Sequence, residues 1–540
     1  MDASASRLPL ANIWIAFITF ALAALMGLYQ VAERSGLFPK IEIIELYFRS
    51  VSSHGVIMGF VLTTFFIMGF GYWVASSSLK IPLWGGKGLG WLGFFISLSG
   101  TAMAAIMLFT GKASIMYTFY PPLKAHPLFY IGATLLVVGS WVWCLQMVMT
   151  MNAWKKQNPG APVPLAMYGM TANAILWFIT SLGVASEVIF QLIPWSLGWI
   201  ETVDVGLART LFSWTLHAIV YFWLIPAYIA FYTLVPKAAG GKLFSDEFSR
   251  ISILMLLIFS VPIGMHHLYV DPMQSAGWKF VHMIGTFMVA VPTLITGFTV
   301  IASMEVAGRL RGGKGLFGWI KALNWSNPMV LAGGLSLLML TIGGWGGLVN
   351  ASYSLDVAVH NTQWITGHFH LIFAGTTVIM YFAIAYYIWP SLTGKPLFSR
   401  KMALLQLWLW FIGMLVLTLP WHILGLIGQP RRIGVPPYSA EFTAPWEPYL
   451  ILMFSGGVIL FISALLLIIN LLFSHFKRKS SEKPVMEYAQ ALHPSLKMPA
   501  LLNGFGFWTA VIAVYMVASY GYPILQFFLM ETHGTFPWSI

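Results

Sequence analysis

Charged residues are scarce in this chain of 540 residues, at 9% of the sequence, whereas hydrophobic residues make up 58%. Soluble globular domains carry about 25% charged residues, so this composition excludes that class. The single cysteine, Cys144, excludes a disulfide within the chain and any site built from several thiolates. A bound metal would therefore need histidine, carboxylate or cofactor ligands. The net charge of +12 does not indicate nucleic-acid binding, because Lys and Arg cluster in loops on one side of the predicted spans.

Long apolar runs are what the chain has in abundance. About 20 apolar residues suffice for a helix to cross a bilayer, so the sequence predicts an all-α, polytopic membrane protein. We expect about thirteen spans, at 12–33, 41–76, 89–110, 127–151, 167–195, 208–236, 250–267, 278–303, 327–347, 361–389, 402–427, 448–474 and 502–528.

The loops define the expected orientation and organisation of these spans. Most of the 29 Lys and Arg residues lie in loops on one side, which the positive-inside rule places in the cytoplasm together with the N-terminus. The C-terminus would then lie outside. We expect residues 1–474 to form a twelve-helix core and 475–501 a cytoplasmic linker. Residues 502–540 would add a thirteenth helix and an outer tail.

Two histidines stand two residues apart in the tenth predicted span, within the sequence VHNTQWITGHFH at 359–370. Residues at this spacing are about 200° apart on a helix, so the imidazoles of His368 and His370 leave opposite faces. A single metal on one helix face would need i,i+3 or i,i+4 spacing. The i,i+2 spacing instead indicates two metal centres, one on each side of the helix.

Six histidines fall inside predicted spans at a similar depth in the outer half of the membrane: His54, His217, His266, His267, His368 and His370. A lone membrane histidine is as often a packed, hydrogen-bonded side chain as a ligand, but six at one level indicate metals. The adjacent pair His266 and His267, with a third histidine, can form a site for copper, zinc or iron that keeps an open position. His54 with either His368 or His370 would make a bis-histidine haem, and the remaining histidine would bind a second haem.

Tyr221 lies four residues after His217 and therefore shares its helix face. Tyr228 and Tyr232 continue that face, a pattern equally typical of an aromatic core stripe. Tyr221 differs because it would stand beside a metal-bound imidazole, where a phenol can donate both a proton and an electron. Glu187 is a functional candidate as a carboxylate within a membrane span, but the sequence indicates no role for it.

Together these motifs resemble subunit I of the haem–copper oxygen reductases. The likeness covers nearly the whole chain and rests on HAIVYFW at 217–223, MHHLYVDP at 265–272 and HNTQWITGHFH at 360–370. The B-type branch, the cytochrome c oxidases of the kind found in thermophilic bacteria, is the most similar. Three further segments resemble that branch: YTFYPPLK at 117–124, GRLRGGKGLFGWI at 308–320 and PRR at 430–432.

The resemblance implies two haems and one copper ion. His54 and His370 would be the axial ligands of a low-spin, b-type haem, and His368 the proximal ligand of a high-spin haem of a- or o-type. The copper would be bound by His217, His266 and His267, with Tyr221 joined covalently to His217. Haem propionates and nearby water would be held at the outer face, where guanidinium groups match carboxylates, by Arg431, Arg432, Asp356, His360 and Asn350.

The resemblance also implies how protons enter. A-type oxidases read HPEVY where this chain reads HAIVY, so Ile219 replaces the glutamate that ends their second proton channel. Protons would then follow one route from the inner side. Threonines at i,i+3 spacing share a stripe along that route, although threonine in membrane helices often bonds only its own backbone. The matching residues are Tyr221, Tyr228, Tyr232, Ser245, Thr293, Thr296 and Thr299.

The implied function is that of a terminal respiratory oxidase, which reduces O2 to water with electrons from cytochrome c and couples this to proton uptake and pumping. It would lie among the lipids of a bacterial or archaeal inner membrane, without a nucleic-acid partner. Electrons would arrive through a subunit II with its own copper site, because this chain has no copper-binding cysteine motif.

Two alternatives remain open. A nitric oxide reductase of the same superfamily uses non-haem iron with added carboxylates and lacks the cross-linked tyrosine. Tyr221, and the lack of an acidic residue beside His217, argue against it. A proton-coupled transporter, the remoter alternative, does not explain the i,i+2 histidine pair.

Overall fold

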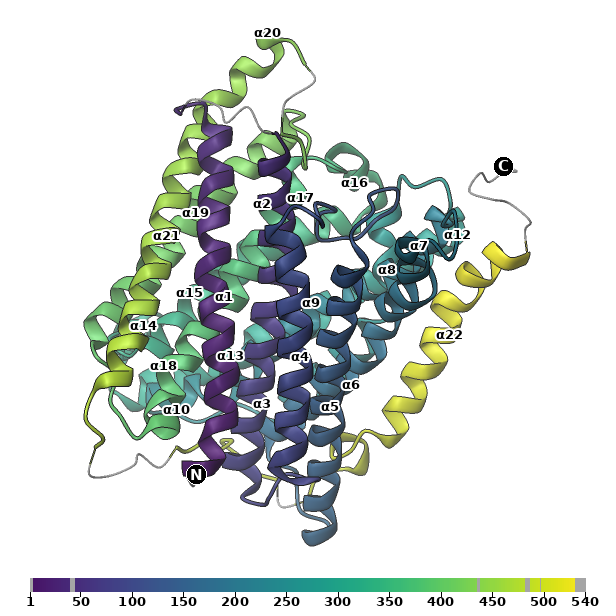
Figure 1. Cartoon of the computed structure of the whole chain (residues 1–540). Coiled ribbons are helices and arrows are strands. Elements are labelled where there is room, and N and C mark those ends of the chain that lie inside the picture. Colours follow the sequence, from purple (N-terminus) through teal and green to yellow (C-terminus); the bar gives the residue numbers. More distant parts are fainter. Residues whose placement is uncertain (1–2, 39–43, 435–437, 481–485, 496, 530–540) are drawn as a thin grey trace.

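The computed structural model describes residues 3–38, 44–434, 438–480, 486–495 and 497–529. Within these ranges the chain forms helices joined by turns and no β-strand, which confirms the predicted all-α class. The helices lie side by side in one bundle, with α22 at its edge (Figure 1). Of the described residues, 12 segments are long and apolar enough to cross a membrane.

Several of these segments are helices interrupted by a π-helical turn, a 3₁₀ turn or a single break. The long segments, in chain order, are α1 (Ala3–Ser35); α2 (Ile44–Val56), η1 (Ile57–Leu62) and α3 (Thr63–Leu79); α4 (Gly86–Phe109); α5 (Pro127–Gln157); α6 (Leu165–Glu187), η2 (Val188–Leu192) and α7 (Ile193–Leu197); α8 (Val205–Leu216), α9 (Ala218–Thr233) and α10 (Val235–Ala239); α12 (Ala276–Met288) and α13 (Ala290–Leu310); α15 (Pro328–Ala351); α17 (Gln363–His370), η4 (Leu371–Val378) and α18 (Ile379–Thr393); α19 (Arg400–Leu426); α20 (Ala440–Thr443), η5 (Ala444–Trp446) and α21 (Glu447–Phe476); and α22 (Gly506–Leu529).

The predicted span at 250–267 is not one helix. Helix α11 (Asp246–Phe259) has 14 residues and is followed by a turn at Pro262 and the 3₁₀ helix η3 (Gly264–Leu268). Proline cannot donate a backbone hydrogen bond, so it does not continue a helix. The prediction of about thirteen spans therefore becomes twelve of spanning length plus this broken segment. The remaining short helices are α14 (Gly318–Ala322), α16 (Tyr353–Val359) and η6 (Ala500–Leu502).

Glycine allows α4 and α5 to pack closely along their length. A Cβ atom on Gly100 would meet the carbonyl oxygen of Gly132 and, at 2.7 Å, the side chain of Leu135. A Cβ atom on Gly139 would meet the Gly93 carbonyl oxygen at 2.6 Å. Apolar burial does not drive helices together in lipid, so close backbone contact through small residues takes its place.

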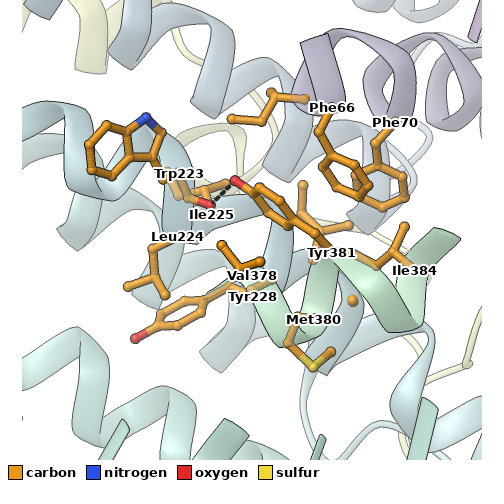
Figure 2. Close-up of a cluster of buried hydrophobic side chains, with 14 of the residues drawn as sticks. Phe66, Phe70, Trp223, Leu224, Ile225, Tyr228, Val378, Met380, Tyr381 and Ile384 are labelled. Carbon is orange, nitrogen blue, oxygen red and sulfur yellow. Dashed lines mark hydrogen bonds between the residues drawn. The ribbon is translucent and has the colours of Figure 1, made fainter. Parts of the chain in front are cut away.

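An apolar, largely aromatic cluster lies in the buried core between α3, α9 and α18 (Figure 2). The Tyr381 ring stacks on Phe66 with ring centres 4.1 Å apart, and its hydroxyl donates to the Trp223 carbonyl at 2.7 Å. This contact ties α18 to α9. His217 directly precedes α9, and His368 and His370 precede α18 through η4, so the cluster helps to fix how these histidines face each other.

Two π-helical segments begin directly beside predicted ligands. Segment η1 starts three residues after His54, and η4 starts at the residue after His370. Such segments are rare and occur most often at functional sites. The wider turn shifts the register of the helix, so it changes where the following side chains point.

Candidate metal centres

Three of the predicted ligands meet at the junction of α8, α9 and η3. The ligand nitrogens of His217, His266 and His267 all lie within 4.8 Å of one another, the only such group of metal-binding side chains among the described residues. His217 Nδ1 is 3.0 Å from His267 Nε2. His217 sits at the break between α8 and α9, and the other two lie on a 3₁₀ turn. The cluster gathers three imidazoles from two segments, a donor set that suits copper.

Tyr221 lies next to this cluster. Its hydroxyl is 3.1 Å from His217 Nε2, as expected from the i,i+4 spacing on α9. The side chain is buried, with 7% of its surface exposed. A phenol in this position can exchange a proton with the imidazole or with a molecule bound at the cluster.

His54 and His370 face each other between α2 and α17. Their rings are nearly parallel, at 12°, with centres 6.2 Å apart. His54 Nδ1 donates to the Ala23 carbonyl at 2.8 Å, and His370 Nδ1 donates to the Thr366 carbonyl at 2.9 Å. These bonds leave both Nε2 atoms as acceptors. The spacing is compatible with one metal ion held between the rings, because metal–imidazole bonds are about 2 Å long.

His368 leaves the other face of α17 and approaches α15. Its Nδ1 donates to the Gly343 carbonyl at 2.9 Å, again leaving Nε2 as the acceptor. A Cβ atom on Gly346 or Gly347 would come within 3.2 Å or 3.0 Å of the His368 ring. Glycines on α15 thus make the space in which this imidazole lies.

These features fit haem and copper. Each imidazole of the His54–His370 pair and of His368 has a fixed tautomer with a free Nε2, as metal-ligating histidines have. Gly27 opens space beside His54, since a Cβ atom there would come within 3.0 Å of the His54 ring. Glycine thus lets the helix backbone approach the His54 ring from α1 and the His368 ring from α15.

Of the five residues predicted to hold propionates, Asn350 lies near the end of α15, Asp356 in α16 and His360 directly after it, and Arg431 and Arg432 lie in the loop after α19. The Arg431 guanidinium donates to the Asn361 side chain at 2.9 Å, and Arg432 donates to the Tyr117 hydroxyl at 3.1 Å. His360 Nδ1 donates to the Asp356 carboxylate at 2.6 Å.

The electrostatics of this region fit an anionic ligand. Burial, followed by repulsion from Arg432, lowers the pKa of Arg431 to about 10, so its guanidinium remains protonated at neutral pH. Burial raises the pKa of Asp356, and the His360 bond opposes that rise. Within the described part of the chain, Arg432 Nε and Asn350 Oδ1 are buried without a hydrogen-bond partner. The unpaired Nε–H of Arg432 is a free donor that matches a carboxylate, whereas Asn350 Oδ1 is a free acceptor.

The predicted proton route is partly connected. The Tyr232 hydroxyl is 2.5 Å from Thr296 Oγ1, whereas Tyr228 donates to Thr293 only over 3.4 Å. Thr296 also bonds its own backbone, at the Pro292 carbonyl. Thr299 Oγ1 is buried and unpaired among the residues described. The last member, Ser245, caps the N-terminus of α11 and donates to Glu247 at 3.2 Å.

Three residues that contact predicted site residues were not predicted from the sequence. Thr286 Oγ1 is 3.0 Å from His266 Nδ1, and Ser252 Oγ is 2.7 Å from Thr296 Oγ1. Both lie in predicted spans that carry other predicted residues, 278–303 and 250–267, but pairing between helices has no signal in one sequence. Tyr117, which binds Arg432, stands in a segment noted only for its likeness. Both carboxylate oxygens of Glu187 are buried without a partner in the described ranges, and no role follows.

Comparison with known proteins shows the family to which the chain is similar. The family model described as cytochrome c and quinol oxidase polypeptide I matches residues 7–459. Cytochrome c oxidase subunit 1 of Thermus thermophilus is 38% identical over 527 residues, which cover 95% of this chain and 93% of that protein. The subunit of the same name from Synechocystis is 27% identical over 461 residues, which cover 82% of this chain and 78% of that protein.

A solved structure gives the same result at the level of the fold. A chain of a haem–copper terminal oxidase dimer, determined by electron cryo-microscopy, superposes with a TM-score of 0.93 at 35% identity, covering 99% of this chain and 94% of that one. The expected resemblance to the thermophilic-bacterium kind is thereby confirmed, and neither alternative function is favoured. The chain belongs to the subunit I family of the haem–copper oxidases, multi-pass membrane proteins, and its activity is that of a terminal oxidase.

Proposed function

We propose that oxygen is reduced in the space between the three-histidine cluster and His368. The observation that carries this assignment is the convergence of His217, His266 and His267 within 4.8 Å, beside Tyr221. When bound there, copper and a high-spin haem supply electrons and open coordination positions for oxygen. The protein holds the imidazoles in place and keeps bulk water away through the apolar cluster below them.

The second haem belongs between His54 and His370. The parallel rings and the two Nδ1 bonds to backbone carbonyls support a bis-histidine, low-spin site, which is closed to ligands and suited to electron transfer. His370 and His368 lie two residues apart on α17, so this one helix turn would join the two haem sites. We assign a b-type haem to the low-spin site and an a- or o-type haem to the high-spin site, following the family resemblance.

Arg431 and Arg432, with Asp356, His360 and Asn350, would hold the haem propionates at the outer face. The free donor of Arg432 and the protonated guanidinium of Arg431 support this role. Because two cations lie in a mostly buried site, an anionic group between them lowers their mutual repulsion.

Tyr221 would supply a proton and an electron to oxygen, and protons would reach it from the inner side. The contacts of Tyr232 with Thr296, and of Thr296 with Ser252, support a route along α9 and α13. Short contacts of this kind place hydroxyl groups for proton exchange. Among the described residues no hydrogen bond joins Tyr228 to Tyr221. A bridging water would therefore have to carry the proton between their two hydroxyl groups.

Electrons would come from cytochrome c through a subunit II that carries its own copper site. The relative from Thermus thermophilus is named a cytochrome c oxidase subunit, which supports this donor. The only cysteine, Cys144, is buried inside the bundle, so this chain does not build that entry site. Taking electrons from outside and protons from inside would charge the membrane, and the reduction of oxygen would supply the energy for pumping.

A spectral and metal inventory of single variants tests these assignments. His370→Ala should remove the low-spin haem signal and His368→Ala the high-spin signal, because the two ligands serve different haems. His267→Ala should lower copper content while both haems stay bound. His493→Ala, at an exposed position outside the spans, is the matched control. Loss of one spectral species in both haem variants, or full copper in His267→Ala, would refute the arrangement.

A further inference from the structure

The 3₁₀ helix η3 carries two of the three proposed copper ligands, yet it begins without a cap of its own. Its preceding residue, Ile263, offers no side-chain hydrogen bond. The first backbone N–H groups of a helix have no partner within the helix. Left unpaired inside a membrane protein, each such group costs stability and loosens the turn.

Two side chains from outside η3 satisfy these groups. The Tyr520 hydroxyl of α22 accepts a hydrogen bond from the Gly264 N–H at 3.2 Å. His282 Nδ1 of α12 accepts one from the Met265 N–H at 3.3 Å. The next residue after Met265 is the proposed copper ligand His266. The cap therefore acts on the backbone directly before the ligand pair.

His282 is itself fixed by α22. Its Nε2 donates to the Ser519 carbonyl at 3.2 Å, which makes Nδ1 the acceptor that the Met265 N–H requires. The rings of His282 and Tyr520 meet edge to face, with centres 5.1 Å apart. Both residues are fully buried, at 0% and 1% exposure. One turn of α22 thus supports both caps.

Space around η3 permits little movement. A Cβ atom on Gly264 would overlap the Ser213 carbonyl of α8 and would lie 2.6 Å from the Tyr520 hydroxyl. Ser213 stands one turn before His217, the third proposed copper ligand. The turn is therefore held between α8 on one side and α22 on the other.

We propose that Tyr520 and His282 are positioning residues for the copper site, and that α22 serves to cap the turn that presents His266 and His267. This inference rests on the proposed copper site. Its physical basis is that a capped turn holds two adjacent imidazoles at fixed positions, whereas an uncapped turn samples others. Residues that orient metal ligands change metal affinity by about 10–100-fold when replaced.

Hydrogen–deuterium exchange and copper release in the purified enzyme test the proposal. In Tyr520→Phe and His282→Leu, the amides at 264–266 should exchange about tenfold faster than in the wild type. Copper should pass to a chelator about tenfold faster. The infrared stretch of carbon monoxide transferred to copper by photolysis should shift or broaden. Both haem spectra should stay unchanged, which shows that the variants fold.

Two matched variants sharpen the test. His282→Asn keeps an acceptor near the position of Nδ1 and should restore most of the amide protection lost in His282→Leu. Tyr515→Phe removes a hydroxyl from the exposed side of the same helix and should have no effect.

The outcomes separate this proposal from the proposed function. Unchanged exchange at 264–266 in both cap variants would overturn the proposal. Faster exchange with unchanged copper release would also overturn it, because the cap would then be structural only. Full copper in His267→Ala would instead refute the copper assignment itself.

Discussion

At the scale of single residues, backbone carbonyls decide how the imidazoles can act. His54, His368 and His370 each donate Nδ1–H to a carbonyl oxygen, at 2.8–2.9 Å. A neutral imidazole has one donor and one acceptor nitrogen. Each bond therefore directs the lone pair of Nε2 away from the helix backbone, towards the place where a metal would bind. The identity of the residue alone does not determine this tautomer.

Tyr221→Phe tests the chemistry at the residue scale. The phenyl ring fills the same volume, so stability, haem content and copper content should change little. Oxygen uptake should fall by about 10²–10⁴-fold, because the hydroxyl beside His217 is the proposed proton and electron donor. Steady-state oxygen consumption with a chemical electron donor measures the effect. Tyr353→Phe, at an exposed ring outside the site, is the control. Near-normal turnover with all metals present would contradict the assigned role.

At the scale of helices, small side chains and hydroxyl groups determine how elements meet. Glycines bring α4 and α5 into backbone contact, and glycines on α15 leave room for His368. Along α9 and α13, pairs of hydroxyl groups cross between helices. Each contact depends on two residues far apart in sequence, so neither residue alone indicates it.

Gly100→Ala tests the glycine contact. The added methyl group would meet backbone atoms of α5, including the Gly132 carbonyl oxygen, and backbone cannot move aside cheaply. We expect a loss of about 1–3 kcal/mol in stability. Thermal unfolding in detergent, followed by haem absorbance, measures it. Gly88→Ala on the same helix has open space around its Cβ and should be neutral or stabilising. Equal melting temperatures for both variants would contradict the packing argument.

Thr296→Val tests the hydroxyl contacts between α9 and α13. The change keeps the shape of the side chain but removes the partner of both Tyr232 and Ser252. Turnover should fall several-fold while haem and copper contents stay normal, because proton delivery alone is slowed. Thr341→Val, an exposed threonine that bonds only its own helix, is the control. If both variants turn over at the same rate, Thr296 lies outside the route.

At the scale of the whole molecule, the proposed coupling depends on which end of the bundle faces the cytoplasm. The positive-inside rule places the loops rich in Lys and Arg there. Electrons and protons would then enter from opposite sides. The orientation of the bundle is thus a functional property of the molecule, since reversing it would reverse the direction in which charge moves across the membrane.

Cysteine labelling tests the orientation. The native Cys144 is buried, at 3% exposure, so it should give little background. Thr202→Cys and Ser480→Cys each place a thiol at an exposed position, in loops that we assign to the outer and inner sides. A membrane-impermeant maleimide should label the first variant in intact cells and the second only after lysis. The reverse pattern would contradict the assigned topology.

The sequence by itself determined the class of the protein and the candidate ligands. Apolar runs near 20 residues long require helices in a membrane, because lipid offers no partner for an open backbone. The i,i+2 pair at 368 and 370 and the i,i+4 pair at 217 and 221 follow from helix geometry alone. These patterns are local, so they can be read from one chain, and the motif combination sufficed to indicate the family.

Only the tertiary structure decided which residues meet across helices. It broke the predicted span at 250–267, where Pro262 ends the helix and η3 presents His266 and His267 from a turn. It placed the ring of His54 opposite that of His370. It also placed the Tyr520 hydroxyl against the Gly264 N–H, although these two residues are 256 apart in sequence. The physical reason is that such contacts depend on how helices pack, and packing arises from the shapes of many side chains at once. Periodicity along one helix shows which face is buried, but not which neighbour covers it.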